Sequence, residues 1–101
     1  MGFVIKEARG ITKYFVDTGI EPEQLRMHIS EVPAGGRSHP PHEHAGVEAF
    51  YILEGHGAIE VDGETYSLGP NEVMLLDGSK PHGLSNAGTV PMRYLVIIAG
   101  H

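Results

Sequence analysis

The sequence predicts one all-β domain built as an antiparallel barrel or sandwich, and three observations support this. A chain of 101 residues can form one hydrophobic core and leaves little for a second. About nine short runs rich in β-branched and aromatic residues follow one another at regular spacing. Turn-forming residues separate these runs, and only Glu21–Gln24 hints at a helix, of one turn at most.

The expected strands are 3–7, 11–16, 25–32, 47–53, 58–61, 64–68, 72–76, 82–86 and 92–99. Asp62-Gly63 is the clearest turn signal, because this dipeptide is typical of a two-residue β-hairpin loop. The sequence contains no internal repeat or linker, so we expect residues 1–101 to form a single domain. The core motifs should fall within 25–99. The strands of residues 1–24 should pack on the barrel or on a partner subunit.

The run 47–53 is apolar on both faces of its predicted strand. Alternation places Glu48, Phe50 and Ile52 on one face and Val47, Ala49, Tyr51 and Leu53 on the other. A closed barrel needs only its inner face to be apolar. The outer face should therefore meet either the N-terminal strands or a second copy of the chain, and we expect a homodimer.

Composition excludes several classes of function. The formal net charge is −6 and the seven Lys and Arg residues are scattered, which argues against a nucleic-acid surface. The chain has no cysteine, which excludes disulfides, thiolate ligands and a cysteine nucleophile. No apolar run approaches a membrane span, and MGFVIKEARG is too short and too charged for a signal peptide. We therefore expect a cytoplasmic protein without nucleic-acid or membrane partners.

The stretch HPPHEHAGVE, residues 39–48, contains a candidate metal site. On an extended chain His42 and His44 point to the same side, about 6–7 Å apart at Cβ, so both imidazoles can reach one ion. Glu48 would lie about 13 Å beyond His44 on a continuous strand, which is too far to share the ion. We expect the chain to bend at Gly46, which tolerates unusual backbone angles. His82, after Pro81 at the start of a late strand, is the candidate fourth ligand.

Two motifs resemble those of the cupins. Gly36, His42, His44, Glu48 and Gly55 have the spacing of the first cupin motif, G-x5-H-x-H-x3-E-x6-G. The second, G-x5-P-x-G-x2-H-x3-N, is matched more loosely: Asn71, Asp77 and Ser79 replace its Gly, Pro and Gly, while His82 and Asn86 keep their places. The resemblance covers residues 25–99.

The resemblance implies a small single-domain cupin, an antiparallel β-barrel or jelly roll with a divalent ion held by His42, His44, Glu48 and His82. Three imidazoles and one carboxylate suit manganese, iron, cobalt, nickel, zinc or copper, and do not distinguish among them. An octahedral ion would keep two positions open for water, dioxygen or a chelating substrate, as a catalytic site requires.

Three functions are compatible with this pattern. The first is a metal-dependent enzyme, which by resemblance would be a dioxygenase, isomerase or epimerase, cyclase or decarboxylase that activates a small molecule by Lewis-acid chemistry. The second is a non-catalytic module that binds or senses a small ligand. The third is a site that binds no metal. Barrel walls formed by Phe50, Ile52 and Met27 would favour a partly apolar ligand over a highly charged one.

The remaining polar candidates have weaker support. His39 lies outside the motif spacing and is either a substrate or ligand-shell contact or a surface residue. We expect no role for His28, His56 or His101. Asp77 and Glu72 are possible general bases that no spacing supports.

Overall fold

The computed structural model describes residues 2–100, and the side chains of all of these except His39 and Pro40. Every assigned element is a β-strand, and every strand pairing is antiparallel. The ten strands are β1 (Phe3–Ala8), β2 (Ile11–Asp17), β3 (Leu25–Val32), β4 (Arg37–His42), β5 (Val47–Glu54), β6 (Gly57–Val61), β7 (Glu64–Leu68), β8 (Val73–Asp77), β9 (His82–Asn86) and β10 (Met92–Ala99). The all-β prediction is confirmed. No helix in the described residues is long and apolar enough to span a membrane.

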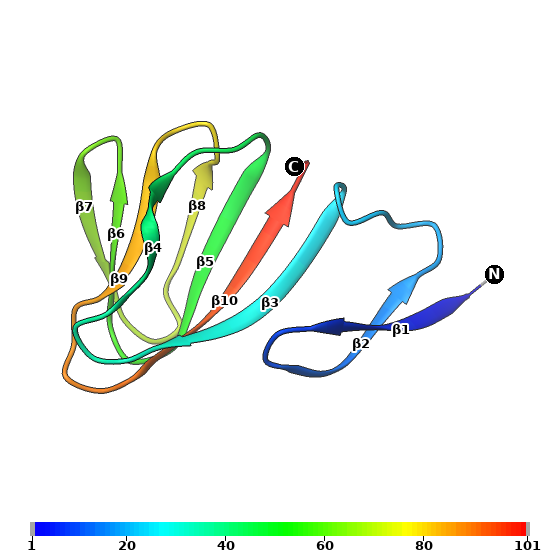
Figure 1. The fold of residues 1–101 in the computed structure, drawn as a ribbon, viewed down its shortest axis with the longest axis horizontal. Coiled ribbons are helices and arrows are strands. Elements are labelled where there is room, and N and C mark those ends of the chain that lie inside the picture. Colours follow the sequence, from blue (N-terminus) through cyan, green and yellow to red (C-terminus); the bar gives the residue numbers. More distant parts are fainter. Residues whose placement is uncertain (1, 101) are drawn as a thin grey trace.

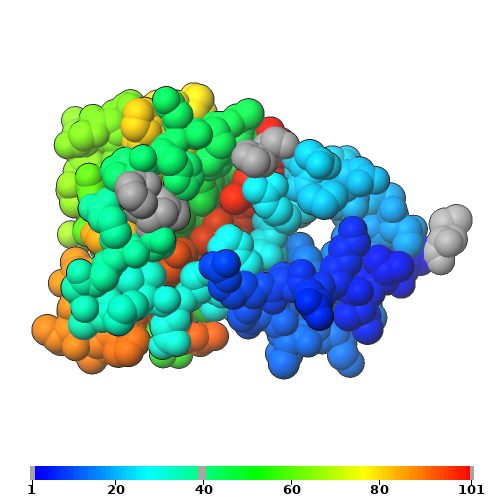
Figure 2. Space-filling view, viewed as in Figure 1, coloured from blue at the N-terminus to red at the C-terminus, as the bar shows by residue number. Residues whose placement is uncertain are grey.

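Eight of the strands form two four-stranded sheets with the orders β3-β10-β5-β8 and β4-β9-β6-β7. The two sheets face each other as a flattened barrel, and β1 and β2 form a separate hairpin beside it (Figure 1). The hairpin meets the barrel through its two-residue turn, Arg9-Gly10, where the Ile29 N–H donates to the Arg9 carbonyl at 2.7 Å. Figure 2 shows an opening between the hairpin and the segment that leads to β3.

The core fills the space between the two sheets. Phe50 and Ile52 from β5 pack with Tyr94 and Val96 from β10 on one side, and with Ile59 and Leu84 from the other sheet. The predicted face of β5 is therefore correct, since Phe50 and Ile52 are 1% and 0% exposed. Met27 does not join this wall. It pairs with Ile97 in a cross-strand row of odd-numbered residues, on the face opposite Phe50.

One strand, β4, was not predicted. Its sequence RSHPPH contains two prolines, which cannot donate to a sheet ladder and normally argue against a strand. The structure accommodates them with irregular pairing, because the register between β4 and β9 shifts twice. The predicted turn at Asp62-Gly63 does join β6 to β7.

Candidate metal centre

The four predicted ligands come from both sheets and meet at one end of the barrel. His42 is the last residue of β4 and pairs with His82, the first residue of β9. Glu48 comes from β5 in the opposite sheet, and His44 lies in the loop between β4 and β5. One ligand atom from each residue lies within 4.8 Å of all the others. The convergence predicted from spacing is thus present.

The bend at Gly46 brings Glu48 back to His44, as the sequence predicted. Gly46 has a φ of +84°, and a Cβ there would lie 2.3 Å from the Ala99 carbonyl oxygen. The loop is held by two backbone hydrogen bonds of 2.8 Å: His44 N–H donates to the Gly78 carbonyl, and Gly78 N–H donates to the Gly46 carbonyl. His44 therefore reaches the site from an irregular loop rather than from the extended strand we expected.

Glu48 is the centre of the cluster. Its Oε1 lies 2.7 Å from His44 Nε2 and 2.9 Å from His82 Nε2. The Glu48 and His82 side chains are 4% and 0% exposed, while His44 is 12% exposed. Burial of a carboxylate is costly unless positive charge or hydrogen bonds compensate it, and here histidines supply that compensation.

The tautomers of two histidines fit a metal ion. His44 Nδ1 lies 2.8 Å from the Ala45 carbonyl and His82 Nδ1 lies 2.7 Å from the Lys80 carbonyl. A carbonyl only accepts, so each Nδ1 carries a proton, and the Nε2 of each ring is directed toward the Glu48 oxygen. At these distances a cation, either a proton on Nε2 or a metal ion, must lie between the nitrogen and the carboxylate oxygen. Metal-binding histidines commonly donate their second ring N–H in this way.

The donor spacing also suits an ion. Ligands 2.0–2.2 Å from a metal, in adjacent octahedral positions, lie about 3 Å apart. The His44–Glu48 and His82–Glu48 separations of 2.7 and 2.9 Å are close to this value. The three imidazole rings surround one point, with centroids 4.7–5.3 Å apart. The residues present therefore fit a divalent ion.

The pKa of His44 reflects its surroundings. Burial lowers the pKa, but the Ala45 carbonyl and the Glu48 carboxylate together outweigh burial, and the pKa is raised from its ordinary value. A proton on this ring and a metal ion would therefore compete for the same place beside Glu48.

An open cavity of about 390 Å³ lies against the cluster. Its walls include Phe50, Tyr94 and Val96 from the barrel core, and a volume of this size suits a small organic ligand. Three residues that the sequence did not indicate also line it: Arg9, Arg26 and His28. His28, expected to have no role, has a pKa lowered by burial and by the nearby guanidinium groups of Arg9 and Arg26, although Glu48 acts in the opposite direction.

Apart from His82, the residues of the second motif mainly hold turns and loops in place. Asn71, in place of a glycine, has a φ of +66°, a conformation that asparagine tolerates well. Asp77 Oδ1 accepts hydrogen bonds from the backbone N–H and the hydroxyl of Ser79, which lower the pKa of Asp77. Asn86 is buried, and its amide donates to the carbonyls of Val32 and Val90.

The other polar candidates gain little support from the structure. Glu72 accepts a hydrogen bond from Gly69 N–H and does not line the cavity. Asp77 does not line the cavity either. His56 packs beside Gly69 and Gly88, away from the cluster. The predictions for the His39 side chain and for His101 fall outside the described residues.

Comparison with known proteins gives one family. Residues 28–98 match the family model described as Cupin domain. Over 73 residues the chain is 36% identical to the L-ectoine synthase of Bordetella parapertussis, a match that covers 70% of this chain and 54% of that protein. It is 30% identical over 64 residues to an uncharacterised protein of Methanocaldococcus jannaschii, which covers 63% of this chain and 51% of that one. The chain thus spans about half the length of these curated relatives.

Solved structures agree on the fold. A cupin protein from Bacteroides fragilis superposes with a TM-score of 0.70 at 27% identity, over 75% of this chain and 65% of that one. The cupin domain of a transcriptional regulator from Enterobacter cloacae gives 0.70 at 22% identity, over 98% and 97% of the two chains.

Proposed function

This chain belongs to the cupin family, and from that premise we propose that it is a metal-dependent enzyme acting on a small molecule. The single observation that carries the proposal is the convergence of His42, His44, Glu48 and His82 beside an open cavity of about 390 Å³. A structural ion needs no such access, whereas a catalytic one does.

The chain's own residues have distinct tasks in this proposal. The Ala45 and Lys80 carbonyls hold the rings of His44 and His82 with Nε2 directed inward. Glu48 provides the negative charge at the centre of the cluster, and Phe50 and Tyr94 keep one side of the cavity apolar. A bound divalent ion would supply Lewis-acid activation of a substrate oxygen. Dioxygenase-like and isomerase-like or cyclase-like chemistry are the classes we favour, and a cytoplasmic location remains part of the prediction.

Metal analysis and a turnover screen test the proposal together. We expect about one divalent transition ion per purified chain, lost in the His42→Ala/His44→Ala double variant. Incubated with a small-molecule cell extract, the wild type should deplete a compound that the double variant leaves unchanged, as followed by mass spectrometry. Metal-free, fully folded wild type from metal-replete medium would contradict the site itself.

One observation favours a second candidate, a non-catalytic module that binds or senses a small ligand. Of the described residues that line the cavity, Glu48 is the only carboxylate, and it is already committed to the cluster. No second carboxylate among these described residues is therefore available as a general acid or base, and His28 is the lining histidine outside the cluster. Retention of a compound without conversion in the same screen would support this candidate over the enzyme.

A further inference from the structure

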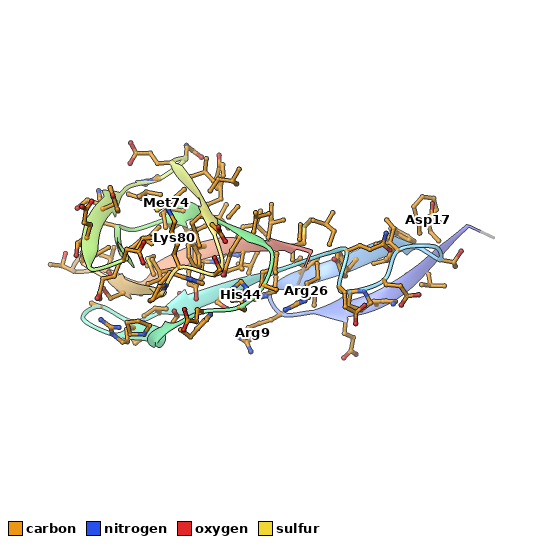
Figure 3. The ribbon with its side chains drawn as sticks, turned by 90° about the horizontal axis from the view of Figure 1, so that it is seen from above. Arg9, Asp17, Arg26, His44, Met74 and Lys80 are labelled. Carbon is orange, nitrogen blue, oxygen red and sulfur yellow. The ribbon has the colours of Figure 1, made fainter. Side chains whose placement is uncertain are left out.

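Two arginines from different parts of the chain line the cavity that the candidate metal cluster faces. Arg26 belongs to β3 and Arg9 to the turn of the β1–β2 hairpin. In Figure 3 their labels lie close to that of His44, at the junction of barrel and hairpin. The chain as a whole is acidic, with a net charge of −6, so two cations beside this cavity oppose the general charge of the surface.

Sheet register places Arg26 opposite the cluster. Arg26 pairs with Ile98 on β10, and Ile98 pairs with Glu48 on β5, so the three residues form one row across the sheet. Residues in such a row point to the same face, and two strand spacings separate the backbones of Arg26 and Glu48 by about 10 Å. This is the span of a small organic molecule with a polar group at each end.

Close docking of the hairpin turn places Arg9. Gly10 has a φ of +75°, and a Cβ there would lie 2.5 Å from the Ile29 carbonyl oxygen and 2.6 Å from Ile29 Cβ. The Ile29 N–H donates to the Arg9 carbonyl at 2.7 Å, and Arg9 Nη1 donates to Ser30 Oγ at 3.1 Å. The turn is thus held against β3 with the Arg9 guanidinium at the cavity.

The charge on Arg9 is not neutralised by a nearby carboxylate. Arg37 and Arg93 form ion pairs with Glu60 and Glu54. Arg9 makes no ion pair with any carboxylate that the structure describes. Its hydrogen bond to the neutral Ser30 hydroxyl orients the guanidinium and leaves its charge available.

We propose that Arg9 and Arg26 form an anchor for the oxyanion group of a small organic anion whose other end faces the His42/His44/Glu48/His82 cluster. A carboxylate and a phosphate ester share the required chemistry, since guanidinium groups bind both through charge-assisted hydrogen bonds. The apolar residues between the two ends, Val96 and Ile98, would contact the carbon chain. The inference rests on the proposed function, whose substrate class it specifies.

Titration calorimetry on metal-loaded protein tests the anchor with defined probes. One arm uses the linear dicarboxylates from malonate to adipate, each against its neutral diamide, and a second uses glycerol 3-phosphate, which has no carboxylate, against glycerol. We expect at least one of these anions to bind about tenfold or more tightly than its neutral counterpart, because the anchor recognises charge. The arm with the tighter binding identifies carboxylate or phosphate as the recognised group.

Variants assign the effect to the two arginines. Arg9→Gln and Arg26→Gln should each lower affinity for the best anion by about tenfold, and Arg9→Lys should recover part of the loss. Arg93→Gln is the matched control, because it removes the same charge from an ion pair that does not line the cavity. It should leave affinity unchanged.

The hairpin turn provides an independent test of position. Gly10→Ala should displace the turn from Ile29 and lower anion affinity as Arg9→Gln does. Gly63→Ala is its control, since Gly63 has a similar φ of +81° but nothing within 4 Å of the point that a Cβ would occupy. Circular dichroism should show that both variants fold.

Metal content separates failure of the anchor from failure of the metal site. A wild type that binds about one ion but binds the anions no better than their neutral counterparts overturns the anchor alone. An equal loss of affinity in Arg9→Gln and Arg93→Gln overturns it as well, because a general charge effect would then explain the binding. A wild type that binds no metal contradicts the proposed function, whatever the anions do.

Discussion

The barrel and the β1–β2 hairpin are made of similar strands but are stabilised very differently. Within the described part of the chain, buried residues occur only from Ser30 onward, and no residue of either hairpin strand is buried. Phe3, Ile5 and Phe15, which we call the outer face of the hairpin, are 68%, 63% and 58% exposed. An isolated two-stranded hairpin is marginally stable in water. A run of residues with high β propensity therefore predicts a strand, but it does not predict whether another part of the protein packs against that strand.

The largest expected effect is in the barrel core. Ile52→Ala should lower the free energy of unfolding by about 2–5 kcal/mol, because Ile52 is 0% exposed and its loss leaves a cavity. Urea denaturation followed by circular dichroism measures the change. Val4→Ala, in the hairpin and 41% exposed, is the comparison and should cost much less. Equal losses at the two positions would mean that the hairpin is as well packed as the barrel.

Metal binding should stabilise the barrel and not the hairpin. At free metal one hundredfold above its dissociation constant, the native state gains about 2.7 kcal/mol. Because the ligands join β4, β5 and β9, hydrogen exchange should slow in these strands and stay unchanged in β1 and β2. Chelation should leave most β structure intact. Cooperative unfolding on chelation alone would instead show that the ion is structural.

We propose that a second copy of the chain covers the outer face of the hairpin, whereas the sequence led us to expect a homodimer through the outer face of the strand 47–53. Ile5→Lys should shift the mass in sedimentation equilibrium from dimer toward monomer, because a charge there cannot be buried without cost. Thr65→Lys, at an exposed position of the barrel strand β7, adds the same charge and should not. A wild type that is monomeric at all concentrations would remove the dimer.

The smallest effect concerns pH and reports on the junction of the two regions. Burial first, and then Arg9 and Arg26, lower the pKa of His28 below its ordinary 6.5, while Glu48 partly opposes them. The unfolded state therefore takes up the proton first as pH falls, so this histidine contributes stability above pH 6.5 that is lost at lower pH. NMR titration should give a higher pKa for His28 in Arg9→Gln and in Gly10→Ala. An unchanged pKa would place Arg9 away from His28.

Sequence was sufficient where a local pattern determines geometry. The spacing of His42, His44 and Glu48 predicted three candidate ligands that the structure brings together, and Gly46 was recognised as the bend that joins them. His82 was found through its motif, although its contact with Glu48 joins residues 34 positions apart. In each case the residue type itself was informative: histidine and glutamate are common metal ligands, and glycine permits a sharp bend of the backbone.

Sequence was insufficient where register or docking determines geometry. Arg26 reaches the cavity because β10 aligns it with Glu48, and that alignment does not follow from the sequence of β3 alone. Arg9 depends on contact between a turn and a distant strand, which no periodicity reveals. The strand β4 was missed because its two prolines lack the backbone N–H that a regular strand needs, which is typical of a loop. In the structure, irregular pairing with β9 nevertheless keeps this segment in the sheet.

The contact between the hairpin turn and β3 also bears on solubility. β3 is the outermost strand of its sheet, and an outermost strand with free backbone groups can recruit another chain into an aggregate. At this edge of the sheet the Ile29 N–H donates a hydrogen bond to the Arg9 carbonyl, so it is not free to pair with another chain. The same two-residue turn that brings a cation to the cavity therefore protects the sheet from unwanted extension, so variants that displace it risk aggregation as well as loss of binding.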